Sequence, residues 1–211
     1  MMERETNLSV RLGLVGERNV LVSEGLNQSA VLFMEPLGGT IFERWEVKGR
    51  NEYTAAEIQS LRNYLEGGGL IYLLTHGSAS RALIGAKRLV QRILPGASLT
   101  PLPASHPIYR SYFQLEGPLP YPYRRGFHEG EAVTWLGATL HGRLAILVDP
   151  EETLHVVDQW VKLKEQSRVY SELAPAAAAQ LINVIVYAAA NRESEEWQSR
   201  RVEGWKETKS R

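Results

Sequence analysis

The 211-residue sequence contains no cysteine. A chain without thiols forms no disulfide, has no thiolate nucleophile and binds no metal through cysteine, so several enzyme classes are excluded. An excess of one charge is also missing, because Lys plus Arg and Asp plus Glu number 24 each. Without a broad basic field, we expect no nucleic-acid partner.

Membrane signals are missing too. The opening residues lack a cationic stretch followed by an apolar core, so we expect no secretory signal and a cytoplasmic protein. The most apolar stretch, residues 175–191, is rich in alanine and is interrupted by Gln180 and Asn183. It falls short of the roughly 20 strongly apolar residues that cross a bilayer. We therefore predict a buried helix there, with a membrane span as the alternative.

The length suits one domain with its own core. We assign residues 1–192 to this domain and residues 193–211 to a charged tail. The tail is either frayed or an arm that docks through Trp197 and Trp205.

The clearest structural signal is the run from Thr54 to Leu74. Thr54 and Glu57 have the spacing of a capping box, which predicts a helix over residues 55–66. Gly67 then stands where a left-handed residue ends the helix. The continuous apolar run Leu70 to Leu74 predicts a central parallel strand covered on both faces.

The other elements are predicted from periodicity and from helix and turn signals. Helices are expected over residues 7–15, 81–94, 154–166 and 171–191, and strands over residues 20–22, 30–34, 98–102, 132–140 and 143–148. Ser80 and Ser171 are the expected N-caps, with Pro175 in the first turn of the last helix. His141 and Gly142 form a hairpin turn, and prolines exclude a helix at residues 106–109. Residues 37–53 form a hairpin or a lid.

Several of these landmarks together resemble a known family. They are Asn7-Leu8, residues 30–34, residues 61–69 with His76-Gly77, Ile93-Leu94-Pro95, residues 106–109, Gly142-Arg143-Leu144 and residues 183–187. In order and spacing they resemble the bacterial family called domain of unknown function 4159, whose fold is similar to class I glutamine amidotransferases. The resemblance implies an α/β fold, a flavodoxin-like three-layer sandwich with a mainly parallel central sheet.

The chain departs from the family pattern in two places. A first strand normally precedes the helix at Asn7, so the sheet lacks an edge strand here or borrows one. Because an open sheet edge and tail tryptophans favour self-association, we expect a homodimer. An acidic pair often precedes the His-Gly of the family, whereas this chain has Leu74-Thr75.

Candidate chemistry starts where the strand of residues 70–74 ends, because open α/β sheets bind ligands at the carboxyl ends of their strands. An amidotransferase needs a cysteine, and Ser78 is the nearest substitute. Ser78 lacks the Gly-x-Ser-x-Gly surroundings of an activated serine, so a helix-capping role is the simpler interpretation.

Three further clusters have both structural and functional interpretations. His76, His106 and His128 suit a metal site if they converge, but their spacing is not diagnostic. Acidic residues at 149–158 suit a solvated helix start as well as a site. Arg124 and Arg125, among aromatic residues, suit stacking or phosphate binding, or an ordered surface loop.

The sequence therefore predicts a non-catalytic small-molecule-binding or assembly module on an amidotransferase-like scaffold, with no catalytic residue, no metal and no cofactor. The alternative is a hydrolase that uses Ser78 or a histidine-bound metal, so an enzymatic role stays open. The predicted ligand-binding residues are Thr75, His76, Gly77, Ser78, His106, Tyr109, Arg125 and His128.

Overall fold

The computed structural model describes residues 26, 29–34, 36, 53–75, 79–118, 135–150, 153–163 and 168–193. The elements in chain order are β1 (Val31–Met34), α2 (Ala55–Glu66), β2 (Leu70–Leu74), α3 (Ala79–Ile93), β3 (Thr100–Pro101), the 3-10 helix η4 (Pro107–Arg110), β4 (Leu136–Leu140), β5 (Arg143–Asp149), α4 (Thr153–Leu163) and α5 (Arg168–Glu193). The predicted helix at residues 7–15, the strand at 20–22 and the tail beyond 193 lie outside the described residues.

The strands form one five-stranded sheet in the order β1-β2-β5-β4-β3. β2 pairs in parallel with β1 on one side and with β5 on the other, as predicted for an interior strand. β4 runs antiparallel to both β5 and β3. The sheet is therefore mixed, and the predicted mainly parallel order holds only for β1, β2 and β5, because a tight hairpin necessarily joins antiparallel strands.

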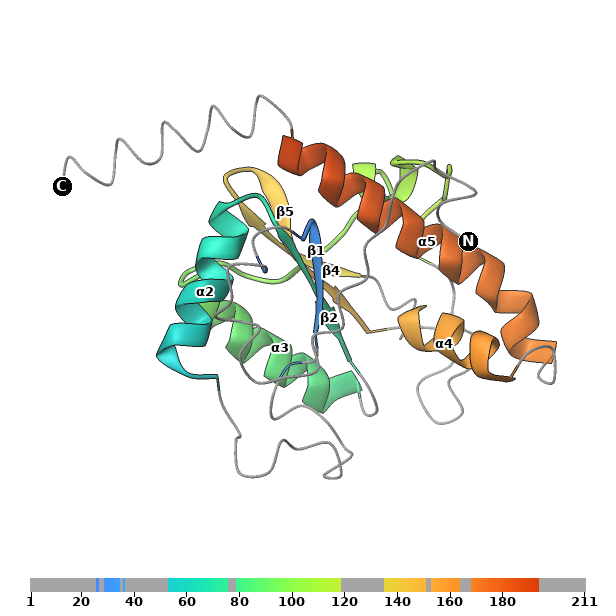
Figure 1. Ribbon diagram of the computed structural model, residues 1–211, viewed down its shortest axis with the longest axis horizontal. Coiled ribbons are helices and arrows are strands. Elements are labelled where there is room, and N and C mark those ends of the chain that lie inside the picture. Colours follow the sequence, from blue (N-terminus) through green and yellow to red (C-terminus); the bar gives the residue numbers. More distant parts are fainter. Residues whose placement is uncertain are drawn as a thin grey trace.

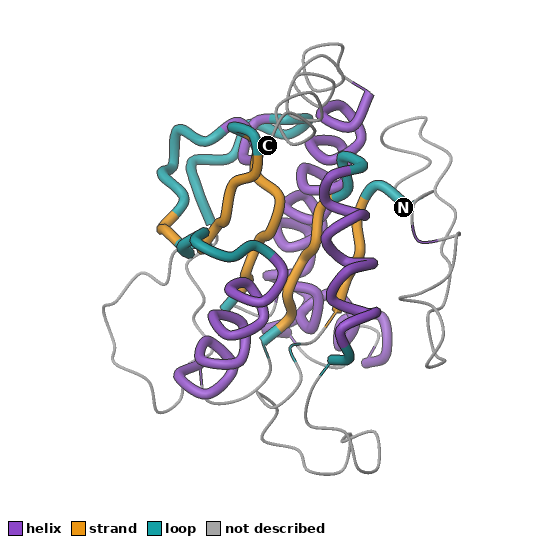
Figure 2. Tube along the Cα trace, turned by 90° about the vertical axis from the view of Figure 1, so that its left-hand side faces the viewer, coloured by secondary structure: helices purple, strands orange, loops and turns teal. Residues whose placement is uncertain are grey.

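Helices cover both faces of this sheet (Figure 1, Figure 2). On one face, α2 and α3 bury Leu61, Leu65, Val90 and Ile93 in a cluster with Ile71 and Leu73 of β2. On the other face, α5 and η4 bury Leu181, Val184, Ile108 and Tyr109 in a cluster with Leu70 and Tyr72. The alternation along β2 between the two clusters is what a strand buried on both faces requires.

The start of α2 has the predicted capping box. The Thr54 hydroxyl accepts a hydrogen bond from the Glu57 amide (3.2 Å), and the Thr54 amide donates to the Glu57 carboxylate (2.6 Å). At the other end, Gly68 rather than Gly67 is left-handed, with φ of 93° against −72°. A Cβ at Gly69 would overlap the Tyr64 ring, so the chain needs glycine there to pass beneath α2.

The predicted hairpin between β4 and β5 is confirmed. His141 and Gly142 have φ of 49° and 77°, and Leu140 pairs with Arg143. Positive φ at both central residues is the geometry of a tight two-residue turn whose twist matches the strands.

Three further predictions about helices are wrong. α3 begins at Ala79, so Ser80 lies in its first turn and is not its N-cap. Residues 107–110 form a 3-10 helix, because a proline is well suited to the first position of a helix. α5 begins at Arg168, which places Ser171 in the first turn and Pro175 inside the helix. A proline removes only one bond of the helical ladder, so packing can carry a helix past it.

The stretch Glu172–Arg192 of α5 is long and apolar enough to span a membrane by length and composition, and 56% of its most apolar window is buried. Its polar residues have partners inside the structure. The Asn183 side chain accepts from the amides of Tyr112 (3.0 Å) and Phe113 (2.7 Å) and donates to the Phe113 carbonyl (2.9 Å). These bonds attach α5 to the backbone at residues 112–113, as in a core helix. The absence of a membrane span stays a prediction.

Candidate functional site

The carboxyl ends of β2 and β5 lie side by side. Leu74, the last residue of β2, is in register with Asp149, the last residue of β5. Thr75 follows at once, is 4% exposed, and donates its hydroxyl to the Asp149 carbonyl (2.8 Å). The two strands are thus fastened together where their loops begin to diverge, the usual place of ligand binding in open α/β sheets.

Asp149 is the charged centre of this region. It is 0% exposed, and its carboxylate is surrounded by donors from three parts of the chain. Oδ1 accepts from the Trp135 indole (3.1 Å), while Oδ2 accepts from the Thr153 amide (2.7 Å) and from the Tyr72 hydroxyl. A carboxylate withdrawn from water needs such donors, because burial without them costs several kcal/mol.

Aromatic rings enclose the carboxylate on the α5 side of the sheet. Trp135 meets Tyr72 edge to face, with ring centroids 6.3 Å apart, and stacks on Tyr109 at 5.4 Å. Phe33 of β1 lies 5.1 Å from Tyr72. These contacts hold the two donors Tyr72 and Trp135 in fixed orientations.

A second group of polar contacts surrounds the first. The Thr153 hydroxyl donates to the Gln180 side chain (3.4 Å), and Gln180 donates in turn to the Gly117 carbonyl (3.4 Å). These bonds join the start of α4, the middle of α5 and the backbone around Gly117 to the sheet end.

The structure brings two of the predicted binding residues to this region. Thr75 forms its floor, and Tyr109 supports it through Trp135. His76, Gly77, Ser78, Arg125 and His128 lie outside the described residues.

His106 lies elsewhere. Its ring is 5.5 Å from Tyr187, whose hydroxyl accepts from the amide of Leu144 near the amino end of β5 (3.4 Å). Leu144 and Asp149 are five positions apart along the strand, about 16 Å. Nδ1 of His106 accepts from the Ile108 amide (3.2 Å), and burial lowers the His106 pKa. His106 is therefore an N-cap of η4 whose ring packs beside Tyr187 of α5.

The described residues contain no group of three or more His, Asp or Glu side chains that could hold a metal. They also show no activated nucleophile at the sheet end. The Thr75 hydroxyl donates to a backbone carbonyl instead of to a base, and the Asp149 carboxylate is engaged with its donors. What this arrangement does is hold the ends of β2 and β5 and the start of α4 in fixed positions relative to one another.

Sequence reasoning missed the central position of Asp149. It left the acids at 149–158 open between a solvated helix start and a site, and the Thr153 amide at the start of α4 does donate to Asp149. The signal was an acid that directly ends a strand whose seven residues are all buried. Such an acid is more often enclosed than solvated.

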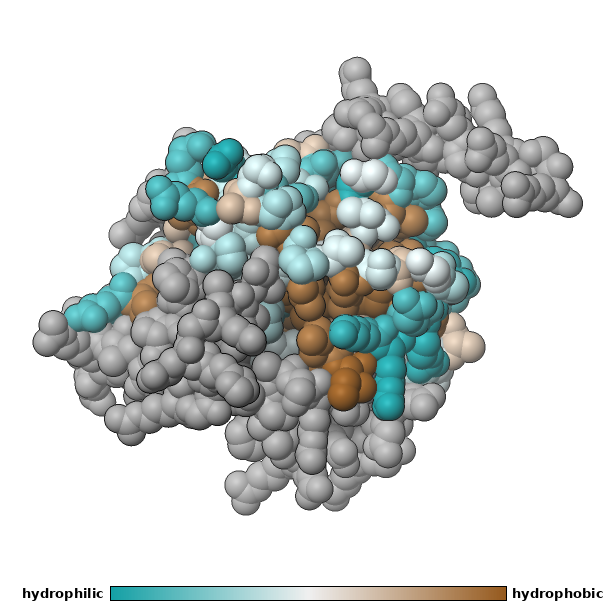
Figure 3. Space-filling view, turned by 180° about the vertical axis from the view of Figure 1, so that it is seen from behind, coloured by the Kyte–Doolittle hydropathy of each residue, from teal (hydrophilic) through white to brown (hydrophobic). Residues whose placement is uncertain are grey.

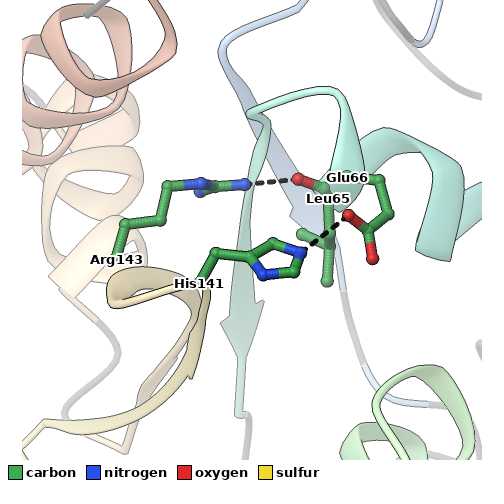
Figure 4. Close-up of polar contacts among 4 residues, drawn as sticks. All are labelled: Leu65, Glu66, His141 and Arg143. Atoms are coloured by element: carbon green, nitrogen blue, oxygen red, sulfur yellow. Dashed lines mark hydrogen bonds and ion pairs between the residues drawn. The ribbon is translucent and has the colours of Figure 1, made fainter. Parts of the chain in front are cut away.

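The amino end of β5 carries the opposite charge (Figure 4). Arg143 is 6% exposed and donates to the carbonyls of Leu65, at the end of α2, and Leu144 (3.1 Å). Burial lowers the pKa of Arg143 to about 10, so it stays charged at neutral pH. Beside it, His141 of the hairpin contacts Glu66 at 3.1 Å. This end of the strand is closed by the carboxyl end of a helix, where a cation is favoured.

A comparison with curated proteins finds no match. Residues 42–189, well over half of the chain, match the family described as domain of unknown function (DUF4159). The matched range contains Thr75, Tyr109, Trp135, Asp149 and Thr153, whereas Phe33 of β1 lies before it. The chain therefore belongs to the DUF4159 family.

Proposed function

We propose that the protein is a non-catalytic module that binds a small molecule, or assembles with a partner through one, over the carboxyl ends of β2 and β5. The scaffold we propose is a flavodoxin-like, amidotransferase-like sandwich without the cysteine nucleophile. The observation that carries the proposal is the buried Asp149, whose carboxylate has donors from Tyr72, Trp135 and Thr153.

This network supports binding more than catalysis for a physical reason. The carboxylate oxygens of Asp149 are already occupied by the Trp135 indole, the Tyr72 hydroxyl and the Thr153 amide, and the side chain is fully buried, so it is not presented to a substrate as a base. The same bonds fix the ends of β2, β5 and α4 relative to one another. Such a floor lowers the entropy lost when a ligand is bound, which is the advantage of preorganisation.

The binding residues we propose are Thr75 and Tyr109, which the structure brings to this region, and, on sequence grounds, His76, Gly77, Ser78, Arg125 and His128. Gly77 has no side chain to block approach to the backbone. His106 is left out because it lies near the amino end of β5. No observation among the described residues favours the alternative, a hydrolase.

The experiment is a thermal-shift screen of the purified protein against a metabolite library, followed by amide chemical-shift mapping of the hits. Shifts should gather at residues 74–79 and 149–153. Ser78→Ala should change affinity by less than about tenfold, the scale of one hydrogen bond, and His76→Ala should weaken it more. Thr100→Val, on exposed β3, is the matched control for a hydroxyl remote from the site.

Two results would oppose the proposal. Hits whose shifts gather at the amino ends of β2 and β5, around residues 66–70 and 141–144, would show that the site is elsewhere. A covalent adduct on Ser78, seen by intact mass, would favour the hydrolase. The other predictions from the sequence, namely one domain, a homodimer, a cytoplasmic location and no nucleic-acid partner, stay predictions.

A further inference from the structure

A long part of the chain contains no acid. Between Glu66 and Glu116 there is no Asp or Glu, although the chain as a whole is neutral. The cations in this stretch are Arg81, Lys87, Arg88, Arg92 and Arg110. Four of these five belong to α3. Because α3 lies wholly within this stretch, it contains no acid. The chain as a whole is neutral, but this stretch of it carries only positive charges.

The outward side of α3 carries this charge to the surface. Lys87, Arg88 and Gln91 are exposed, and Ile84, one turn earlier, is 49% exposed. Residues 84, 87, 88 and 91 share one side of a helix because they are three, four and seven positions apart. Within the described residues, neither Lys87 nor Arg88 takes part in an ion pair.

Neighbouring acids on α2 do not neutralise this side. Glu57 is buried in its capping box with Thr54, and Glu66 is occupied by His141 at the far end of the helix. Arg62 of α2 adds a further cation between the helices, where it donates to the carbonyls of Ile93 (2.8 Å) and Arg92 (3.0 Å).

An apolar strip adjoins the basic side of α3. Leu99, Leu136 and Leu140 are each partly buried against the core cluster that α3 covers. The outward side of α3 is connected to β4 through the segment after the helix. Gln91 of α3 donates to the Ala97 carbonyl, and Thr100 pairs with Gly137 of β4. Seen from behind, this side of the molecule shows apolar atoms at its centre next to a hydrophilic group (Figure 3). We call the surface formed by Ile84, Lys87, Arg88, Leu99, Leu136 and Leu140 the α3–β4 face.

We propose that the α3–β4 face docks an acidic, leucine-rich segment of a partner protein. An apolar centre beside a charged margin is the usual build of a protein–protein interface. Charge complementarity supplies the choice of partner, since Lys87 and Arg88 form no ion pair among the described residues.

The same observations disfavour two other anionic partners. Nucleic acid is bound by many phosphate contacts or by stacking on aromatic rings, and the α3–β4 face has neither. A bilayer surface requires several protruding apolar side chains, whereas on this face Ile84 alone protrudes and Leu99, Leu136 and Leu140 are each partly buried. A protein segment can reach such recessed leucines with its own side chains.

The test uses the full-length protein and a fluorescein-labelled peptide built of repeated Glu-Leu-Glu-Glu-Leu units, with binding measured by fluorescence anisotropy. The wild type should bind this peptide, and more weakly as salt is raised. A peptide with serine in place of leucine should bind at least about fivefold more weakly, because it loses the apolar contacts. The double variant Lys87→Glu and Arg88→Glu should weaken binding about tenfold or more, since two attractions become repulsions.

Two further variants separate the α3–β4 face from charge in general. Ile84→Ser should weaken binding about threefold or more. Arg110→Glu, which reverses an exposed cation on η4, should change it by less than about twofold. Circular dichroism and melting curves confirm that each variant is folded.

The proposal is overturned if the peptide does not bind, if the serine peptide binds equally well, or if Arg110→Glu and the α3 variants have equal effects. It is also overturned if the α3 variants reduce binding to oligo-thymidine or to phosphatidylglycerol vesicles while leaving peptide binding unchanged. None of these outcomes bears on ligand binding above Thr75.

Discussion

The two ends of β5 carry opposite buried charges, Arg143 at the amino end and Asp149 at the carboxyl end. The partners of Arg143 are backbone carbonyls of α2 and of the strand itself. The partners of Asp149 are mostly side chains from separate elements, together with one amide. The amino end of β5 is closed by the end of α2, whereas at its carboxyl end β2, β5 and α4 meet.

This difference separates two uses of a buried charge. Backbone carbonyls at a helix end stay where the helix puts them, so Arg143 adds to a position that is already fixed. Asp149 instead determines how Tyr72, Trp135 and α4 lie relative to one another, and removing it leaves several buried donors without an acceptor. We therefore expect the carboxyl end to be more sensitive to mutation than the amino end.

The largest effect should come from Asp149→Ala. Loss of the acceptor for Trp135, Tyr72 and the Thr153 amide should cost about 3–5 kcal/mol of unfolding free energy. Urea denaturation measures it. Asp158→Ala is the control, because its ion pair with Lys162 is exposed and should be worth less than about 1 kcal/mol. A loss from Asp149→Ala no larger than that of the control would mean that the junction is not held by Asp149.

Arg143→Met should cost less, about 1.5–3 kcal/mol at pH 7, for the loss of charged hydrogen bonds to the carbonyls of Leu65 and Leu144. Methionine keeps most of the apolar stem, so the change isolates the guanidinium. The same urea titration gives the value. If Arg143→Met proves costlier than Asp149→Ala, the comparison between the two ends is the wrong way round.

His106 gives a pH-dependent effect close to the amino end. Burial lowers its folded pKa, so as pH falls below 6.5 the unfolded chain takes up the proton first and stability is lost. Protonation also removes the acceptor that caps Ile108, a bond worth about 1 kcal/mol. His106→Asn keeps an acceptor at every pH, so its stability relative to the wild type should rise between pH 7.5 and pH 5. Equal pH profiles from urea midpoints would contradict this.

The smallest effect should come from His141→Asn. Asparagine is well suited to the left-handed turn position, which offsets the loss of the exposed contact with Glu66. Stability should change by less than about 0.5 kcal/mol in thermal melts. Gly142→Ala, at φ of 77°, should cost more, about 1 kcal/mol, because alanine is strained there. A reversed order would show that the Glu66 contact matters more than the turn.

The features predicted well from sequence are local. Thr54 with Glu57 and His141 with Gly142 determine their own geometry within a few residues, so the capping box and the hairpin are both confirmed. The strand Leu70 to Leu74 was also found, because burial on both faces leaves a continuous apolar run. Helix starts were placed less well, since packing extended α5 past Pro175.

The features that were missed depend on distant pairs. Tyr72 and Asp149 are 77 residues apart, and nothing in the sequence near either one indicates the other. His106 was grouped with Thr75 by residue type, whereas its place is set by Tyr187 on α5. A sequence pattern predicts that an acid ends a strand, but only the three-dimensional arrangement shows which donors enclose it.

The reversed direction of β4 has one more consequence. Because β4 runs against β5, the residue that enters it, Trp135, arrives at the same edge of the sheet that β2 and β5 leave. Gly117, whose carbonyl accepts from Gln180, is linked to the same junction through Thr153. The entrance to an antiparallel strand thus brings an indole donor to the edge at which the parallel strands end, and Asp149 accepts from it. One reversed strand therefore lets a single sheet supply both the buried acceptor and one of its donors at the same edge.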